Sequence, residues 1–283
     1  VVNIFSESGI AGSAFLVESP DVPVISFTGS TRTGRAIAAA GASQLKRFGL
    51  ELGGKTPMIV FDDADLDAAL PVLERAITVF AGQFCMAGSR ILAERGIADR
   101  LRQALAKRLA RVRLGPASDP ASEMGPLIDR HSVARVDAIV ENALAEGARA
   151  IVRGGPAQEP ALAAGAFYRP ALLEVTDPEL AIIQEEVFGP VATFQVFEGE
   201  AAAIGLANNS DFGLAASIWS RDPDRPLRLA RELQVGTVWI NDWAAIHDEF
   251  EEGGFKQSGI GRLNGLASLH DFQEIKHIAF KAA

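Results

Sequence analysis

Short apolar runs alternate with helix-like stretches along the chain, and this alternation restricts the fold more than any other feature. The apolar run at 24–27 precedes an alanine-rich stretch at 35–45, and the run at 57–61 precedes a helix-like stretch at 66–80. Strands alternating with helices are typical of βαβ units, in which a helix connects two parallel strands. We therefore predict an α/β fold with open, twisted sheets and flanking helices.

The alternation continues to the C-terminus. Further helices are expected at 97–112, 133–147, 202–208 and 227–233, and from residue 266. Further strands are expected at 91–93, 150–152, 168–173, 192–197, 214–219, 236–241 and 275–280, and a strand-like run opens the chain at 1–4.

The composition is that of an ordinary globular protein. The chain has 283 residues, 48% hydrophobic and 22% charged, which suffices for one large domain or two smaller ones. Its net charge is −9 with both signs interspersed, so we expect no nucleic-acid surface and no membrane patch. No apolar run approaches the roughly 20 residues that span a bilayer, and no signal-peptide pattern opens the chain. We expect a soluble, cytoplasmic protein, and, since no methionine opens the chain, a piece of a longer one.

Cys85 is the only cysteine, which excludes an internal disulfide and a cysteine metal cluster. Two interpretations stand. An unpaired thiol is commonly a small, buried hydrophobe, or it is a nucleophile. The small or flexible residues Gly82, Ala87, Gly88 and Ser89 surround it, and they favour a turn where the backbone approaches a ligand closely.

A glycine turn at 28–34 stands between the apolar run at 24–27 and the following helix. Strand, glycine turn and helix together point backbone N–H groups at a phosphate. The pattern is G-x-T-x-x-G from Gly29 to Gly34, and it lacks the second glycine of the usual dinucleotide fingerprint. The alternative is a helix N-cap at Ser30 or Thr31 without a ligand.

Two glutamates stand in unusual surroundings. Glu51 lies between leucines and before two glycines, and an apolar environment would raise its pKa toward the range of a general base. Glu186 precedes a phenylalanine and a Gly-Pro turn, where a carboxylate can hold ribose hydroxyls. The alternatives are an exposed edge residue for Glu51 and an ordinary charged turn for Glu186.

No metal site is expected. Asp62, Asp63 and Asp65 lack the glycine and distal glutamate of a calcium loop, so we interpret them as helix caps. His131 has no second histidine at metal-binding spacing, and it is better placed at the start of a helix. The loop at 242–252 carries Trp243 and Phe250 among five acids and is long enough to suggest a function.

These segments together resemble the aldehyde dehydrogenase superfamily, whose motifs occur here in the family's order. The motifs are FTGSTRTG at 27–34, LELGGK at 50–55, GQFCMAGSR at 82–90, EEVFGP at 185–190 and GGFKQSGIGR at 253–262. The resemblance covers the whole chain but only the C-terminal part of a full-length member. It implies the end of a Rossmann-type coenzyme domain at 1–53, an α/β catalytic domain at 54–257 and a C-terminal return with an oligomerisation strand at 258–283.

The resemblance also implies a function, namely NAD- or NADP-dependent oxidation of a small aldehyde to a carboxylic acid. Cys85 would be the nucleophile, with its own N–H as an oxyanion donor, and Glu51 would activate the water that hydrolyses the thioester. The cofactor-binding residues would be Phe27, Thr28, Gly29, Ser30, Gly34, Leu52, Gly53, Glu186 and Phe188, and the substrate residues would be Phe84, Trp243 and Phe250. The partner would be a second copy of the chain, in a homodimer or homotetramer, or a missing N-terminal half.

Four departures from the family pattern stand out. The family's oxyanion asparagine and ribose-binding lysine would precede Val1, so the chain alone is expected to be impaired. Leu263 stands where many members carry a glutamate thought to relay protons. Glu251 and Glu252 replace a frequent Pro-Phe pair and would give an acidic substrate mouth suited to a cationic aldehyde, unless they are structural.

Three alternatives to a hydrolytic dehydrogenase stay open. A non-catalytic or split-chain remnant would not bind nicotinamide cofactors. A coenzyme A-acylating dehydrogenase would release the thioester to coenzyme A, and Glu51 argues against it. A thiol hydrolase would need a histidine partner, but none lies in a matching motif.

Overall fold

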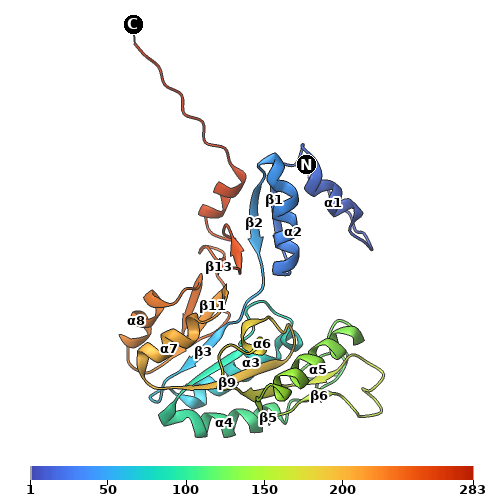
Figure 1. Cartoon of the computed structure of the whole chain (residues 1–283), viewed down its shortest axis with the longest axis vertical. Coiled ribbons are helices and arrows are strands. Elements are labelled where there is room, and N and C mark those ends of the chain that lie inside the picture. Colours follow the sequence, from blue (N-terminus) through green and yellow to red (C-terminus); the bar gives the residue numbers. More distant parts are fainter. Residues whose placement is uncertain (1, 283) are drawn as a thin grey trace.

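The computed structural model describes residues 2–282, so Val1 and Ala283, the outer ends of the expected units 1–53 and 258–283, lie outside the described residues. Figure 1 shows two bodies joined by the chain that leads from β2 into β3. The smaller body contains a three-stranded sheet ordered β1 (Val24–Thr28), β2 (Arg47–Glu51) and β14 (Gly259–Ile260). β1 and β2 are parallel and are connected by α2 (Thr31–Gly41) and η1 (Ala42–Gln44), α1 (Ala11–Glu18) packs beside α2, and β14 returns antiparallel to β2.

The larger body is built on a seven-stranded sheet ordered β12-β11-β3-β4-β9-β8-β5. Its strands are β3 (Pro57–Val60), β4 (Arg90–Glu94), β5 (Arg149–Val152), β8 (Ala171–Glu174), β9 (Val191–Phe197), β11 (Ala215–Trp219) and β12 (Thr237–Ile240). Every neighbouring pair is parallel except β5 with β8. The helices are α3 (Leu66–Thr78), η2 (Val79–Gly82), α4 (Arg95–Leu109), α5 (Arg130–Ala145), α6 (Ala181–Gln184), α7 (Gly199–Asn208) and α8 (Arg225–Glu232). The predicted α/β architecture is confirmed.

Helices cover both faces of this sheet, which explains its continuous apolar strands. Met58 and Val60 of β3 pack in one cluster with residues of α3 and α4. Ile59 and Phe61 point the other way into a cluster with residues of α7 and α8. The core of the larger body therefore lies on both sides of β3 and β4.

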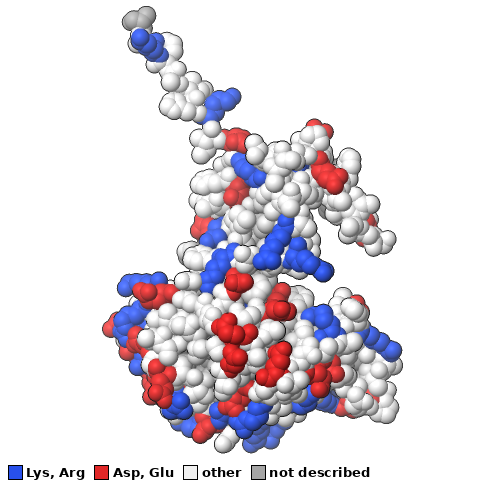
Figure 2. All heavy atoms as spheres, viewed as in Figure 1, with Lys and Arg blue, Asp and Glu red and all other residues white. Residues whose placement is uncertain are grey.

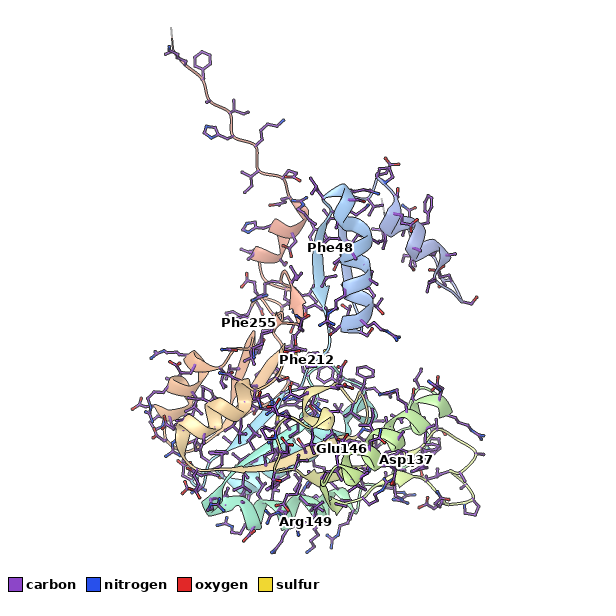
Figure 3. All side chains as sticks on the ribbon, in the orientation of Figure 1. Phe48, Asp137, Glu146, Arg149, Phe212 and Phe255 are labelled. Atoms are coloured by element: carbon purple, nitrogen blue, oxygen red, sulfur yellow. The ribbon has the colours of Figure 1, made fainter. Side chains whose placement is uncertain are left out.

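Two minor strand pairs complete the fold. β6 (Gly155–Pro156) pairs with β7 (Tyr168–Arg169), and β10 (Phe212–Gly213) pairs with β13 (Phe255–Lys256), both antiparallel. Phe212 and Phe255 lie at the junction of the two bodies (Figure 3). The segment that carries Phe255 thus ties the end of the chain to the larger body.

Several expected elements differ from those observed. The strand expected at 168–173 is divided into β7 and β8 at Pro170, which has no N–H to donate to a ladder. The helix expected from residue 266 is only a short 3₁₀ helix, η3 (Ala267–Phe272). Among the described residues the runs at 2–4 and 275–280 form no strand, because a strand needs a neighbour to pair with and these segments lie beside none. Figure 1 shows the C-terminal segment extending away from both bodies.

The aspartates after β3 have different roles. Asp65 caps α3 by accepting from the backbone N–H of Asp67 at 3.1 Å, as expected. Asp63 is not a cap, because its carboxylate accepts from the Ser220 hydroxyl at 3.0 Å and pairs with Arg225 at 3.1 Å. It ties the loop after β11 to the loop after β3.

Both signs of charge are spread over the surface. On the face shown in Figure 2, acidic and basic side chains lie side by side over the larger body, without a broad basic area. Within residues 2–282, no helix is both long enough and apolar enough to cross a bilayer.

Candidate active site

The candidate site lies where the strand ends of the two sheets meet. Thr28 and Glu51 are cross-strand partners and the last residues of β1 and β2. The turns at 52–56, 82–89 and 185–190 lead into β3, β4 and β9, which are parallel neighbours. The amino ends of these three strands share one edge. Segments distant in the sequence therefore converge between the carboxyl ends of the small sheet and the amino ends of the large one.

Cys85 lies in a turn whose backbone is constrained before it. Phe80, Ala81 and Gly82 have φ values of 51°, 54° and 70°, in the left-handed region that side chains other than glycine disfavour. A Cβ atom at Gly82 would lie 2.2 Å from the backbone of Gly189. The turn that presents the thiol is thus held against the Gly-Pro turn before β9, and only glycine fits at residue 82.

We expect Gly82→Ala to lower the free energy of unfolding by about 2–5 kcal/mol, since it adds backbone strain to a steric overlap. Thermal and denaturant unfolding would measure this loss. Gly205→Ala in α7 is the matched control, because a Cβ there meets nothing within 4 Å, and it should be neutral or slightly stabilising. Equal stability of the two variants would contradict the packing described for Gly82.

The Cys85 thiol is half-buried and protonated at neutral pH. Burial raises its pKa to about 11, and the negative charges of Glu186 and Glu51 add to the effect. The backbone amides of Met86 and of Cys85 itself act in the opposite direction. The thiol faces two carboxylates and backbone N–H groups. It is therefore not simply a buried hydrophobic side chain.

Glu51 is half-buried at the end of β2, and the interpretation as an exposed edge residue is wrong. Burial, followed by the charge of Glu252, raises its pKa to about 7, while Arg262 opposes the shift. Its Oε1 atom is buried and has no hydrogen-bond partner among the described residues. A carboxylate with these properties can accept a proton near neutral pH.

The Glu186 side chain packs against the glycine turn at 53–54, which follows β2. Its Oε1 accepts from the backbone N–H of Gly54 at 3.4 Å, and a Cβ atom at Gly53 would lie 2.5 Å from its Oε2. A Cβ at Gly54 would lie 2.5 Å from the carbonyl oxygen of Cys85. Burial raises the pKa of Glu186, partly offset by Gly54, Lys55 and Arg135. Because Gly53 and Gly54 have no side chains, Glu186 and the Cys85 turn can both pack closely against this backbone segment. An ordinary charged turn would not require two such close approaches.

The glycine turn after β1 is joined to Glu51 by the backbone. Gly29 donates its N–H to the Glu51 carbonyl at 3.0 Å, and a Cβ at Gly34 would overlap the Leu52 side chain at 2.6 Å. Ser30 caps α2 by accepting from the N–H of Thr33 at 3.2 Å, so the helix cap is formed by Ser30, and the phosphate site at this turn stays a prediction. Beside this turn, a cavity of about 630 Å³ lies between α1, α2 and β1, and Phe27 and Thr33 are among its lining residues.

Of the expected substrate residues, two lie together. Phe84 and Trp243 contact each other edge to face, with ring centroids 5.8 Å apart, and the Trp243 indole donates to the Met86 carbonyl at 2.9 Å. Phe250 is 70% exposed and contacts His247 instead. Phe188 is 43% exposed and has a φ of 49°. The residues around Cys85 therefore include Phe84 and Trp243, whereas Phe250 belongs to a separate part of the same loop.

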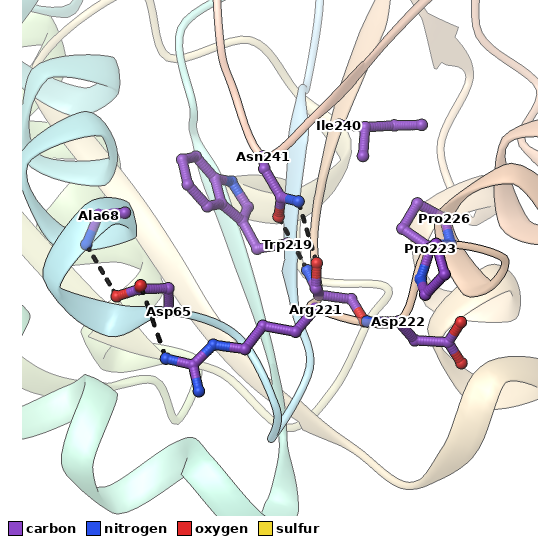
Figure 4. Close-up of a pocket in the computed structure, with 10 residues that line it drawn as sticks. Asp65, Ala68, Trp219, Arg221, Asp222, Pro223, Pro226, Ile240 and Asn241 are labelled. Atoms are coloured by element: carbon purple, nitrogen blue, oxygen red, sulfur yellow. Dashed lines mark hydrogen bonds and ion pairs between the residues drawn. The ribbon is translucent and has the colours of Figure 1, made fainter.

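A cavity of about 440 Å³ at the carboxyl ends of β11 and β12 lies away from this site (Figure 4). Asn241 exchanges two hydrogen bonds with the backbone of Ser220, and Asp65 pairs with Arg221 at 3.5 Å. Because Cys85 and Glu186 precede amino ends of the same parallel sheet, this cavity is at the opposite edge. The polar side chains of Asn241, Asp65 and Arg221 at this cavity hold neighbouring loops together.

Sequence reasoning assigned no role to three residues that hold the site together. Ser258 is buried, and its hydroxyl donates to the Gly53 carbonyl at 2.7 Å and accepts from the N–H of Gly213 at 3.0 Å. Lys55 is buried and donates to the Ile182 carbonyl at 2.8 Å, and burial lowers its pKa to about 7. Arg262 lies beside Glu51 and donates to the Gly261 carbonyl at 2.7 Å. Only their positions within the motifs at 50–55 and 253–262 could have indicated them.

The chain belongs to the aldehyde dehydrogenase family, whose model matches residues 1–278. It is 41% identical to betaine aldehyde dehydrogenase from Bacillus subtilis (strain 168) over 278 residues, covering 98% of this chain and 57% of that protein. A point mutant of betaine aldehyde dehydrogenase from Staphylococcus aureus, crystallised with NAD+ and with a BME-modified cysteine, matches with a TM-score of 0.92 and 40% identity. That match covers 94% of this chain and 54% of the other. The chain thus spans about half the length of the relatives it matches.

Proposed function

We propose that this chain carries the thiol and the general base of an NAD-dependent aldehyde dehydrogenase, which oxidises an aldehyde to a carboxylic acid. The observation that carries the proposal is the convergence of Cys85, Glu51 and Glu186 on the turn at 53–54. Membership of the aldehyde dehydrogenase family supports it. The NAD+ complexes of the relatives favour NAD, with NADP as the alternative.

The residues of the smaller body, which contains β1 and β2, fit a dinucleotide. The cavity between α1 and α2 is lined mainly by apolar side chains, which suits an adenine ring. The first N–H groups of α2 have no partner within the helix and suit a pyrophosphate beside Ser30. Glu186 would accept hydrogen bonds from a ribose, with Phe188 nearby, and Phe27, Thr28, Gly29, Gly34, Leu52 and Gly53 would shape the backbone around the cofactor. When bound, NAD supplies the oxidant that takes up a hydride.

The chemistry divides into two steps. The Cys85 sulfur gives its proton to water and attacks the aldehyde carbon, and the hydride on that carbon would then pass to the bound nicotinamide, so that a thioester remains on Cys85. Glu51 takes a proton from water and the resulting hydroxide attacks the thioester, which releases the acid and the Cys85 thiolate; the thiolate then takes a proton from solvent, while the proton on Glu51 stays there. The N–H of Cys85 would stabilise the oxyanion, and Phe84 and Trp243 would pack against the substrate. Phe250 would lie further out on the same loop.

We also propose the division into 1–53, 54–257 and 258–283. The separate sheet of β1 and β2 and the return of β14 support it. The C-terminal segment exposes Ile275, Ile278 and Phe280 by 93%, 82% and 92%, which favours pairing with a second copy in a homodimer or homotetramer.

Cofactor binding tests the proposal directly. Calorimetry should detect NAD binding, and Ala36→Trp, which fills the cavity between α1 and α2, should weaken it at least about tenfold. Ala39→Trp is the control, because Ala39 is exposed on the same helix but does not line the cavity. If neither NAD nor NADP binds, the chain is a non-catalytic remnant.

Product analysis separates the remaining enzymatic alternatives. Oxidation of an aldehyde with and without coenzyme A should yield the free acid in both cases. A coenzyme A thioester as the main product would assign the chain to the acylating branch. Esterase activity lost on His247→Ala would favour a thiol hydrolase.

A further inference from the structure

Glu251 and Glu252 are adjacent acids with different surroundings. Glu251 is exposed, and its Oε1 accepts from the backbone N–H of Ala267 at 2.9 Å, so its carboxylate has a structural role. The backbone of Glu252 forms an antiparallel bridge with Leu263, with N–O distances of 2.9 Å and 2.8 Å. The Glu252 side chain is half-buried and makes no hydrogen bond or ion pair within residues 2–282. It therefore remains a free carboxylate.

The residue that follows Glu252 lies directly against Glu51. Gly253 has a φ of 158°, and a Cβ atom there would be only 2.9 Å from the Glu51 Oε1. No side chain can stand at this point between the two segments. The Glu51 Oε1 is the buried atom without a partner, and the charge of Glu252 is the second-largest cause of the raised Glu51 pKa. The two carboxylates are thus electrostatic neighbours.

Hydrolysis makes this proximity chemically significant. In the proposed reaction, Glu51 gains a proton in every turnover and must lose it before the next. Arg262 cannot accept a proton, and its guanidinium is bonded to the Gly261 carbonyl. Glu252 can, and it also lines a cavity of about 230 Å³ together with the exposed side chains of His247 and Phe250.

We propose that Glu252 accepts the proton from Glu51 after each hydrolysis, carried between the two carboxylates by water, and releases it to solvent through this cavity. The O–H bond on Glu51 breaks, an O–H bond forms on Glu252, and water then takes the proton, so no electrons are transferred. Glu252 acts through Glu51 and is a positioning residue in the proton path. The inference rests on the proposed function. The titratable groups facing this pair are the Cys85 thiol, Arg262, Glu251 and His247.

Glu252→Gln tests the inference on the full chain with a neutral aldehyde. The first burst of NADH should be unchanged, because hydride transfer precedes hydrolysis, while the steady-state rate should fall at least about tenfold. Added imidazole or formate should restore much of the rate, and Glu252→Asp should retain more of it than Glu252→Gln. Glu249→Gln removes one exposed charge from the same loop and should behave like the wild type.

An unchanged steady-state rate in Glu252→Gln, or a loss that imidazole and formate do not relieve, overturns the inference. A readout independent of turnover keeps it testable if the chain proves inactive. Carbon-13 NMR titration of labelled glutamates, assigned with Glu51→Gln, should show the Glu51 pKa falling in Glu252→Gln as the neighbouring charge is removed. An unmoved Glu51 titration also overturns the inference. Absence of aldehyde oxidation in the wild type counts against the proposed function alone.

Discussion

Replacing Cys85 with serine is expected to reduce aldehyde oxidation by about 10³-fold or more, because the variant loses the atom that attacks the aldehyde. A serine hydroxyl is close in size but is a far weaker acid and nucleophile than a thiol. The thiol is only half-buried, and it faces two carboxylates as well as the apolar core, so the fold should be preserved. NADH formation would measure the loss, and unchanged NAD affinity and unfolding temperature would show that it is chemical.

Iodoacetamide provides a matched test, since the wild type has one cysteine and can be alkylated at one thiol. Labelling should proceed with loss of activity in the wild type and should not occur in Cys85→Ser. Ser89→Ala is the control in the same turn: the Ser89 hydroxyl has no partner among the described residues, so its removal should leave activity intact. Dehydrogenase activity that survives in Cys85→Ser would sink the proposed mechanism.

Replacing Glu51 with glutamine should stop the reaction after the first half. A glutamine cannot accept a proton from water, so NADH should appear in a single burst while hydrolysis slows about 10²–10⁴-fold. In the wild type, hydrolysis should accelerate with rising pH through about 7, because the ionised carboxylate is the active form. Mass spectrometry should detect the acylated chain in Glu51→Gln.

The same substitution should not destabilise the fold at alkaline pH. Burial raises the Glu51 pKa from 4.5 to about 7, so the folded state holds its proton more tightly than the unfolded state. This contribution to stability is present at low pH and is lost as the pH rises through 7. At pH 8, Glu51→Gln should therefore unfold at the same temperature as the wild type or above it.

Steady-state turnover equal to the wild type, or a pH profile still rising through 7 in the variant, would rule out Glu51 as the base.

Much of the fold was predictable because its signals are local. β3 is apolar at every position since both of its faces are covered, and α3 begins at the predicted cap Asp65. The role of Asp63 was not predictable, because its partners Ser220 and Arg225 belong to a distant loop. The run at 275–280 has a strand-like sequence but forms no strand, since pairing depends on a neighbouring chain segment and not on composition.

By itself, the sequence determined the α/β class, the glycine turns and the family's motifs, because periodicity and glycine positions are properties of neighbouring residues. Only the tertiary structure decided which groups share one environment. Glu51 acquires a pKa of about 7 from burial and from Glu252, and Glu186 comes to rest on the turn at 53–54 that also contacts the Cys85 backbone. Burial and charge pairing arise when distant segments pack together, so no local pattern specifies them.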